Sequence, residues 1–317
     1  MDVTDQTITQ LTTLPDSVTG FAVSPDGAQI AFTTSPATAG SGNETIWLMK
    51  NGRTPHPLLT CTAAACHNLI WAADGRRLIY ERRDLDENGI PAQPHLWWLD
   101  SASGDTLPVL QEDTPATAPR LSPDDAWIAY VAPAEDGLWL YHFADGRSHF
   151  IASATGTPVA WNPDGQSLLY SALNTVALPT ESEHEDEHSH ANLATHLFLF
   201  DLASGESRQL SADVVIEDNV PAWSPDGEWI AFGRRQARTG AARALWLMRA
   251  DGSDAHSLND DPAWNVGPPS WSEDGRCLLF QRYNLNDPQA EPGIWLLELA
   301  TGSLRELTSP GFLPAWN

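Results

Sequence analysis

The sequence predicts an all-β protein, a β-propeller of six four-stranded antiparallel blades. Two observations lead to this prediction. First, a hairpin pattern occurs six times along the 317 residues: an apolar segment, a tight turn of the Ser-Pro-Asp-Gly type and a second apolar segment. Second, another apolar segment rich in Trp and Leu follows each copy. Repeats of about 40–50 residues with four strands each are typical of propeller blades, which bury their faces against one another.

The hairpin is clearest between Pro221 and Phe232 (PAWSPDGEWIAF). In its turn, Pro presets φ at the first corner, Asp hydrogen-bonds back to the backbone and Gly adopts the left-handed conformation. The flanking Trp, Ile and Phe suit half-buried strands. The turn aspartates are spaced by 48, 50, 40, 62 and 48 residues: Asp26, Asp74, Asp124, Asp164, Asp226 and Asp274.

Two further strands complete each repeat. In the fifth repeat the third strand begins at Leu245 (LWLM) and runs into the turn Asp251-Gly252, a dipeptide typical of hairpins. Fourth strands are short, as in LRELT at 304–308. We also expect an outer strand at 7–14 and an inner strand at 314–317. These ends allow a seven-bladed alternative with an incomplete blade, but no segment supplies its two middle strands, so six blades are favoured.

The aromatic residues recur with the repeat. Small residues such as Ala160 and Ala222 fall in the innermost strands, where space near a propeller axis is limited. The next residue is often Trp, as at Trp161 and Trp223, on the opposite face of the strand. We therefore interpret the tryptophans as packing between blades rather than as a ligand-stacking set.

The repeated P-x-W-S-P-D-G-x-x-I-A-F motif, the following I/L-W-L-M strand and the later Asp-Gly turn resemble the TolB family of six-bladed propellers with WD40-like repeats. The resemblance spans nearly the whole chain and implies a single domain over residues 1–317. It also implies a protein-binding scaffold, although relatives of such propellers occur beside catalytic domains.

Composition limits the classes of partner. The chain has 17 basic and 42 acidic residues, for a formal net charge of −25. A field of this sign repels nucleic acid and anionic lipid and favours cationic partners. No apolar run is long enough to cross a bilayer, which argues against membrane insertion. We expect a monomer in the periplasm or another extracytoplasmic compartment, with the export signal absent from this sequence; a cytoplasmic location is the alternative.

The three cysteines form no disulfide framework. Cys61 and Cys66 bracket a short loop between repeats, and a disulfide between them is favoured over free thiols and over a metal site. Cys277 lies in an apolar strand and is interpreted as a small core residue.

Candidate binding residues lie at one end of the blades. Loops after second strands and connections after fourth strands should emerge together there, because antiparallel strands reverse direction. Variable loops on a rigid scaffold commonly carry binding sites. The expected partner-binding residues are charged residues in these segments: Arg82, Arg83, Asp218, Arg234, Asp260 and Asp261. Ion pairing among the arginines and carboxylates is the alternative interpretation.

The long gap between repeats contains a loop insertion at about 176–195 that is rich in His and Glu. Imidazole and carboxylate groups suit Zn²⁺ or another divalent cation, and the candidate ligands are His184, His188, His190 and His196. A solvated polar loop without a metal is the alternative, since a tract of this composition cannot bury apolar surface.

The sequence contains no G-x-S-x-G nucleophile motif and no phosphate-binding loop. We therefore expect a non-catalytic scaffold that binds a protein or peptide through an acidic, loop-rich face. The alternatives are a hydrolase or lyase, a propeller associated with a peptidase, and a metal-binding protein that uses the His/Glu-rich loop.

Overall fold

The computed structural model describes residues 9–14, 16–36, 43–111, 114–152, 159–176, 192–213, 215–237, 239–259, 261–287, 289–312 and 314–316. These residues are all-β, contain no helix and form the six antiparallel sheets of a β-propeller. The six-bladed prediction is confirmed, and no described residue belongs to a seventh sheet. The chain divides into two compact units, residues 1–151 with Asn317 and residues 152–316. Each unit contains three sheets.

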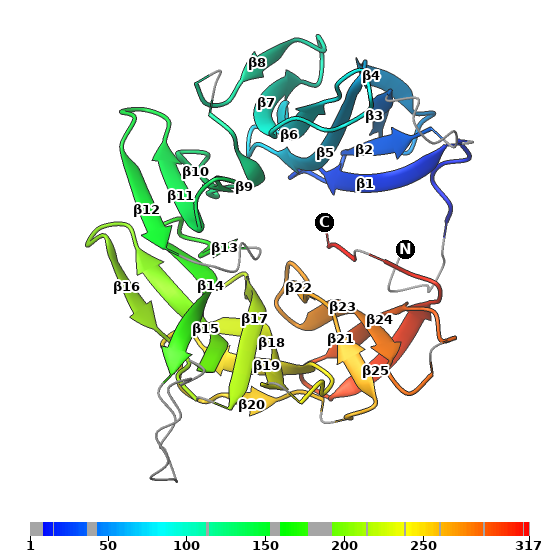
Figure 1. The fold of residues 1–317 in the computed structure, drawn as a ribbon. Coiled ribbons are helices and arrows are strands. Elements are labelled where there is room, and N and C mark those ends of the chain that lie inside the picture. The colour runs from blue at the N-terminus through cyan, green and yellow to red at the C-terminus, as the bar shows by residue number, and fades with distance from the viewer. Residues whose placement is uncertain are drawn as a thin grey trace. The chain divides into compact units, whose positions relative to one another are not determined.

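In the first unit the strands of each sheet pair in chain order (Figure 1). The first sheet has β1 (Ser17–Val23), β2 (Gln29–Ser35), β3 (Glu44–Lys50) and β4 (His56–Cys61). The second has β5 (Ala64–Trp71), β6 (Arg77–Asp84), β7 (His95–Asp100) and β8 (Thr106–Pro108). The third has β9 (Thr117–Leu121), β10 (Trp127–Val131), β11 (Gly137–His142) and β12 (Ser148–Ala152).

The second unit repeats this arrangement. The fourth sheet has β13 (Ala160–Trp161), β14 (Ser167–Val176), β15 (Asn192–Asp201) and β16 (Glu206–Gln209). The fifth has β17 (Ile216–Trp223), β18 (Trp229–Gln236), β19 (Ala244–Arg249) and β20 (His256–Ser257). The sixth has β23 (Cys277–Asn284), β24 (Gly293–Glu298) and β25 (Ser303–Thr308). Its inner strand is divided into two short strands that both pair with β23: β21 (Trp264–Val266) and β22 (Ser270–Trp271).

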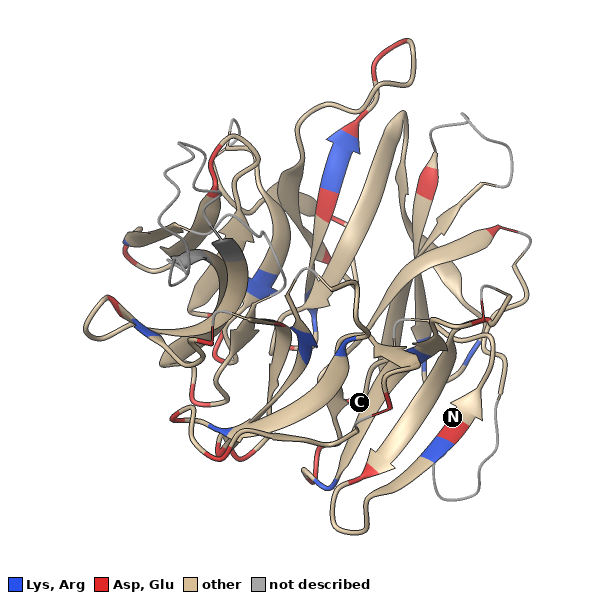
Figure 2. Cartoon of the chain, turned by 60° about the horizontal axis from the view of Figure 1, so that its bottom comes forward, with Lys and Arg blue, Asp and Glu red and all other residues tan. Residues whose placement is uncertain are grey.

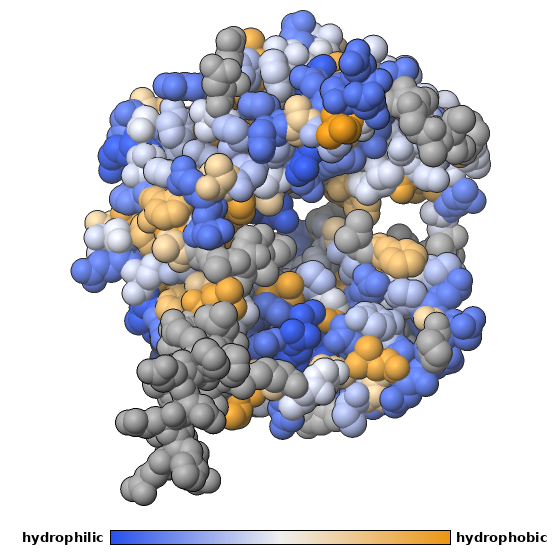
Figure 3. All heavy atoms as spheres, in the orientation of Figure 1, coloured by the Kyte–Doolittle hydropathy of each residue, from blue (hydrophilic) through white to orange (hydrophobic). Residues whose placement is uncertain are grey.

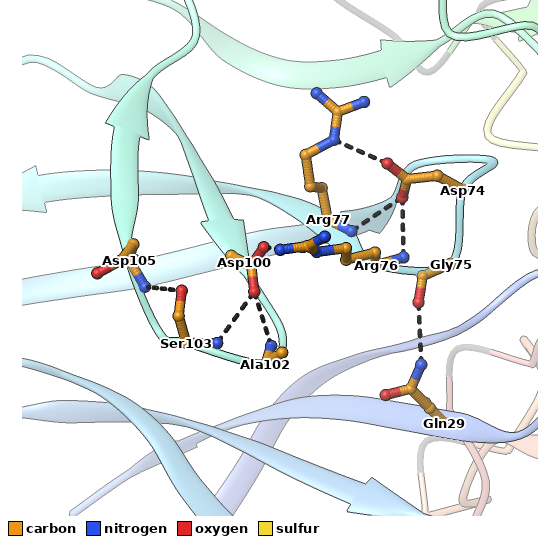
Figure 4. Close-up of polar contacts among 9 residues, drawn as sticks. All are labelled: Gln29, Asp74, Gly75, Arg76, Arg77, Asp100, Ala102, Ser103 and Asp105. Carbon is orange, nitrogen blue, oxygen red and sulfur yellow. Dashed lines mark hydrogen bonds and ion pairs between the residues drawn. The ribbon is translucent and has the colours of Figure 1, made fainter.

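The hydrogen bonds to the turn aspartate and the positive φ of the turn glycine are present as predicted. In the first sheet Asp26 accepts hydrogen bonds from the Ser24 hydroxyl at 2.6 Å and from the Ala28 amide at 3.0 Å. Gly27 has a φ of 68°, as the turn requires. In the second sheet, where Ala replaces Ser, Asp74 accepts from two backbone amides instead, those of Arg76 and Arg77 (Figure 4).

Polar contacts between turns also join neighbouring sheets. The Gln29 side chain donates to the carbonyl of Gly75 at 2.9 Å, from the first sheet to the second (Figure 4). The Ala73 amide in turn donates to Asp125 of the third sheet at 2.8 Å. Asp125 takes the place of Gly in its turn, with a φ of 57°. The repeated turns therefore both close the hairpins and link adjacent sheets within the first unit.

The tryptophans of the inner strands connect adjacent sheets, as predicted. Trp71 Nε1 donates to the carbonyl of Ala22 in the preceding sheet at 3.1 Å. Trp223 and Trp271 make the corresponding hydrogen bonds to Ala160 at 3.2 Å and to Ala222 at 3.1 Å. Each indole thus buries its ring between sheets while its only donor remains satisfied.

The expected terminal strands are not present. Residues 9–14 and 314–316 are not in strand conformation, and the remainder of both segments lies outside the described residues. The amide of Trp316 still donates to the Ser270 hydroxyl at 3.4 Å, so the end of the chain contacts the sixth sheet. The residue pattern at 7–14 predicted the first of these strands and the family resemblance predicted the second, but a strand also needs a partner along its length.

Acidic residues lie mostly in turns and loops, whereas the strands are largely uncharged (Figure 2). On the surface that Figure 3 shows, the hydrophobic residues form small separate patches. The predicted disulfide between Cys61 and Cys66 is formed, with Cα atoms 6.4 Å apart, and joins the end of β4 to β5. Both cysteines are fully buried, and Cys277 is a half-buried free thiol.

Candidate binding site

A cavity of about 380 Å³ opens at one end of the fifth sheet. Three segments form it: the connection that precedes β17, the end of β18 with the following loop and the start of β19, and the connection that follows β20. The prediction that these segments emerge together is therefore confirmed in the second unit. The lining residues are Asp213, Ile216, Arg234, Arg235, Gln236, Ala241, Ala242, Ala244, Trp246, Asp261 and Pro262.

The guanidinium of Arg234 in the cavity wall is held by an ion pair and by two aromatic rings. Its Nε and Nη2 donate to the two carboxylate oxygens of Asp218 at 2.7 and 2.8 Å. It stacks 4.4 Å from the centre of the Trp246 ring and 5.1 Å from that of Phe232. Asp218 is fully buried, and the Arg234 side chain is 15% exposed. Bidentate pairing and ring stacking hold the guanidinium in one orientation.

Arg234 keeps donors for a ligand. A guanidinium has five N–H groups, and Asp218 accepts from only two of them. Among the described residues, none accepts a hydrogen bond from the Nη1 group. A preorganised arginine with unused donors on a cavity wall can bind a carbonyl or carboxylate oxygen with little loss of side-chain entropy.

The other charges around the cavity are also paired. Arg235 contacts Glu217 at 2.6 Å. Asp261 lies 3.5 Å from Arg282, whose guanidinium stacks 4.4 Å from the Trp264 ring. Burial lowers the pKa of Arg282, and the nearby Asp261 partly opposes this shift. The ion-pairing interpretation of the arginines is thus correct for the contacts that the structure shows, and the cavity is polar without a large excess of either charge.

His196 lies in β15 beside this ion pair, and not in a loop as the sequence suggested. It is fully buried, and neither ring nitrogen has a hydrogen-bond partner among the described residues. Burial lowers its pKa; Asp218 opposes this effect and Arg234 adds to it. The longer strands explain the misplacement, because β14 and β15 pair as far as Val176 and Asn192.

The predicted partner-binding residues separate into two groups. Asp218, Arg234 and Asp261 come together at the cavity of the fifth sheet. Arg82 and Arg83 lie in the first unit, where they pair with Asp84 and Glu81, both at the end of β6. Asp260 lies outside the described residues.

The predicted metal ligands are separated as well. His184, His188 and His190 lie outside the described residues, so metal binding by the insertion stays a prediction. Within the described part of the chain, no group of three or more His, Cys, Asp or Glu side chains is placed to hold a metal ion. The same residues include no helix long and apolar enough to cross a membrane.

The sequence analysis missed two features of the cavity. It assigned Trp246 to packing alone, whereas the ring packs against Phe232 and also lines the cavity. It did not single out Ala241 and Ala242, whose small side chains leave the cavity open. The available signal was the run Gly240-Ala241-Ala242 shortly after two adjacent arginines, a combination that the other repeats lack.

No family model matches the chain. Two curated proteins are similar to it in sequence. The uncharacterized peptidase YuxL of Bacillus subtilis is 22% identical over 193 residues, which cover 53% of this chain and 29% of that protein. Dipeptidyl-peptidase 5 of Porphyromonas gingivalis is 22% identical over 201 residues, 58% of this chain and 27% of that protein. The chain therefore spans less than a third of either relative.

Solved structures with the same fold belong to proteins with different names. A putative TolB from Agrobacterium tumefaciens has a TM-score of 0.55 at 20% identity and covers 80% of this chain and 84% of its own. An oligogalacturonate lyase in complex with manganese scores 0.58 at 19% identity, with 90% and 74% covered. The acylaminoacyl peptidase of Pyrococcus horikoshii scores 0.61 at 14% identity, with 92% and 45% covered. At these identities the likeness establishes the β-propeller fold alone.

Proposed function

We propose that this protein is a propeller scaffold that binds a peptide or protein partner, and that a peptide segment enters the cavity of the fifth sheet. The observation that carries the proposal is Arg234, fixed by Asp218 and Trp246 on the cavity wall with unused N–H donors. The cavity is surrounded by the connection before β17, the loop between β18 and β19 and the connection after β20. Loops that converge in this way suit recognition of an extended partner.

A peptide suits this wall better than a free anion. Asp218 already balances the charge of Arg234, and Glu217 balances that of Arg235. A backbone carbonyl needs a donor but no net positive charge. Asp213 and Asp261 on the same wall can accept hydrogen bonds from peptide N–H groups or cationic side chains. The net charge of −25 also favours a basic partner over an acidic one.

The proposal is tested with a random peptide library displayed on phage and selected against the whole chain. Peptides that are enriched are then synthesised, and their affinities are measured by isothermal titration calorimetry. Ala242→Trp fills the cavity without touching the ion pair, and we expect it to weaken binding by about 10-fold or more, which corresponds to about 1.4 kcal/mol.

The matched control is Ala102→Trp, which adds the same side chain to an exposed turn of the second sheet. It should bind the selected peptides as the wild type does. The proposal is contradicted if no peptide is enriched, or if Ala242→Trp binds every selected peptide with wild-type affinity while its melting temperature is unchanged.

A second candidate function is that of a propeller within a peptidase. Two curated relatives named as peptidases support it, and the chain spans only part of each. The size of the polypeptide in its native cells tests this candidate. Detection with an antibody raised against this chain should reveal a band well above 34.6 kDa if the propeller belongs to a larger enzyme. A band at the size of the chain itself rejects this candidate.

We also propose an extracytoplasmic location, which the Cys61–Cys66 disulfide supports, because disulfides persist mainly in oxidising compartments. Native cells are lysed directly into denaturant that contains an alkylating reagent, which exposes both buried cysteines, and mass spectrometry then tests the proposal. Both cysteines should escape the alkylating reagent unless the sample is first reduced. Alkylation of both without reduction would place the protein in a reducing compartment.

A further inference from the structure

A second hollow, of about 270 Å³, lies in the first unit on the third sheet. It is lined by Thr114 and Pro115, which precede β9, and by residues of β10 with its following loop, of β11 and of the turn that leads into β12. The lining residues are Thr114, Pro115, Tyr130, Ala132, Pro133, Ala134, Glu135, Trp139, Tyr141, Gly146 and Ser148. The hollow shares no residue with the cavity of the fifth sheet, and we call it the aromatic groove.

Aromatic rings make up the floor of the aromatic groove. Tyr130 on β10 and Trp139 on β11 are register partners, so their side chains lie on the same face of the sheet. Tyr141 follows two residues after Trp139 and also lies on that face. Phe150, which is 46% exposed, packs on Trp139 with ring centres 5.1 Å apart and extends the apolar surface.

Polar groups in the aromatic groove are left without partners. Tyr130 is 7% exposed and lines the groove, yet its hydroxyl has no hydrogen-bond partner among the described residues. The Tyr141 hydroxyl is likewise unbonded within the same residues. A tyrosine hydroxyl that reaches the groove without a protein partner can donate a hydrogen bond to an acceptor of a bound group. Burial raises the pKa of Tyr130, with a smaller contribution from Glu135, and the hydroxyl therefore stays protonated as a donor.

Among the described residues, Glu135 is the one charged side chain that lines the aromatic groove. It accepts a hydrogen bond from Trp139 Nε1 at 3.0 Å, which fixes the edge of the indole beside the carboxylate. Glu135 is exposed and belongs to a protein of net charge −25, so it favours a cationic group at this end of the groove.

We propose that the aromatic groove binds a proline-rich peptide segment in the polyproline II conformation, with a basic residue placed against Glu135. A polyproline II segment makes no internal hydrogen bonds, so its carbonyls are free to accept from tyrosine hydroxyls, while its rings pack between aromatic and proline side chains. This site is additional to the cavity of the fifth sheet and lies in the other unit.

A neutral sugar is the competing occupant, because its hydroxyls also match tyrosine and carboxylate groups. Two observations favour the peptide. Pro115 and Pro133 line the groove together with the aromatic rings, and this apolar lining suits proline rings better than hydroxyl groups. The Glu135 carboxylate is matched by one basic side chain, whereas a neutral sugar leaves it without a counter-charge.

Fluorescence anisotropy tests the proposal with an oligoproline peptide that begins with arginine, and with a Gly-Ser peptide of the same length and the same arginine. We expect the oligoproline peptide to bind about 10-fold more tightly. Tyr130→Phe removes one unbonded hydroxyl without changing the packing, and it should weaken oligoproline binding by about 3- to 10-fold. Glu135→Gln keeps the acceptor for Trp139. It should bind the oligoproline peptide that begins with arginine no more tightly than an otherwise identical oligoproline peptide that begins with glycine.

Two controls separate this proposal from the proposed function. Tyr170→Phe removes a hydroxyl that is bonded to Ser207 in the second unit, and it should leave oligoproline binding unchanged. Ala242→Trp should also leave it unchanged, because that substitution fills the other cavity. Equal affinity for the two peptides, or an unchanged affinity in Tyr130→Phe, overturns the proposal. So does tight binding of maltotetraose that Tyr130→Phe weakens, which would assign the groove to a sugar.

Discussion

The second and fifth sheets carry nearly the same residues at the end of their second strands but use them differently. The second has Tyr80-Glu81-Arg82-Arg83, and the fifth has Phe232-Gly233-Arg234-Arg235. Arg82 and Arg234 occupy the same register position, opposite Cys66 in one sheet and Asp218 in the other. Arg82 therefore has no carboxylate opposite it and pairs with the exposed Asp84.

The buried carboxylate of the second sheet lies one position earlier, at Glu81, which is 1% exposed. Glu81 accepts from Thr117 of the third sheet at 2.6 Å, and from Asn68 at 2.7 Å and Arg83 at 2.8 Å in its own sheet. Its role is to join sheets. In the fifth sheet Gly233 stands at that position, and the buried carboxylate orients an arginine toward a cavity instead. The same repeat can therefore either join neighbouring sheets or form a cavity, depending on which strand carries the buried carboxylate.

The largest expected effect is that of Asp218→Ala. It leaves the guanidinium of Arg234 largely buried without its counter-charge, which should lower the free energy of unfolding by about 3–5 kcal/mol. Urea denaturation measures this change. Arg82→Ala, at the same position of the second sheet, should cost no more than about 0.5 kcal/mol because its ion pair is exposed. Similar losses in the two variants would remove the distinction between the sheets.

Glu81→Gln should have the next largest effect, about 1.5–3 kcal/mol, because it weakens three charge-assisted hydrogen bonds. The variant also tests a pH dependence. Burial raises the pKa of Glu81, but its hydrogen bonds from Thr117, Asn68 and Arg83 together lower it below the usual value. The stabilisation is therefore present above the unfolded-state pKa of about 4.3 and is lost as the pH falls toward the folded-state pKa.

This pH dependence is measured by thermal denaturation of the wild type and Glu81→Gln between neutral and acidic pH. The wild type should lose stability more steeply below about pH 4.3 than the variant does. Parallel curves would show that Glu81 does not stabilise the second sheet through its charge.

Reduction of the Cys61–Cys66 disulfide should lower the free energy of unfolding by about 2 kcal/mol, the loop-entropy value for so short a loop. The effect should be confined to the boundary between the first and second sheets, since the fifth sheet has no equivalent bond. Denaturation with and without a reducing agent measures it, and the double variant C61A/C66A should be insensitive to the reagent. An equally sensitive double variant would show that the reagent acts elsewhere.

The smallest expected effect comes from His196→Leu beside the Asp218–Arg234 pair. Because the folded-state pKa of His196 is lowered, the unfolded chain takes up a proton first as the pH falls below about 6.5, and stability declines. Replacement by leucine should remove this decline and change stability at neutral pH by about 1 kcal/mol or less. Melting curves between pH 8 and pH 5 measure it, and an unchanged pH profile would contradict the placement of His196.

The sequence predicted those parts of the fold that local chemistry determines. The six turns, each with an Asp at the same position, and the tryptophans of the inner strands could be predicted because each local pattern favours one geometry. The Asp218–Arg234 pair was not predictable as a contact, although both residues were singled out. Their pairing depends on the register of β17 and β18, which shifts between Asn219 and Ala222 at a residue with positive φ, Val220.

The aromatic groove escaped the sequence analysis for a related reason. Tyr130 and Trp139 belong to the aromatic positions that pack between blades. The recurrence of these positions in the sequence does not show which side chain will have a polar atom without a hydrogen bond. That depends on the loop after β10 and on the connection that contains Pro115, whose paths follow no repeated motif.

The central claim is that the fifth sheet binds a peptide and the second sheet does not. Hydrogen–deuterium exchange of the whole chain, with and without a peptide selected on phage, tests it most directly. We predict slower exchange at residues 213–216, 234–246 and 261–262 and no change at residues 82–95 of the second sheet. Protection of residues 82–95 without protection of the fifth sheet would contradict the claim.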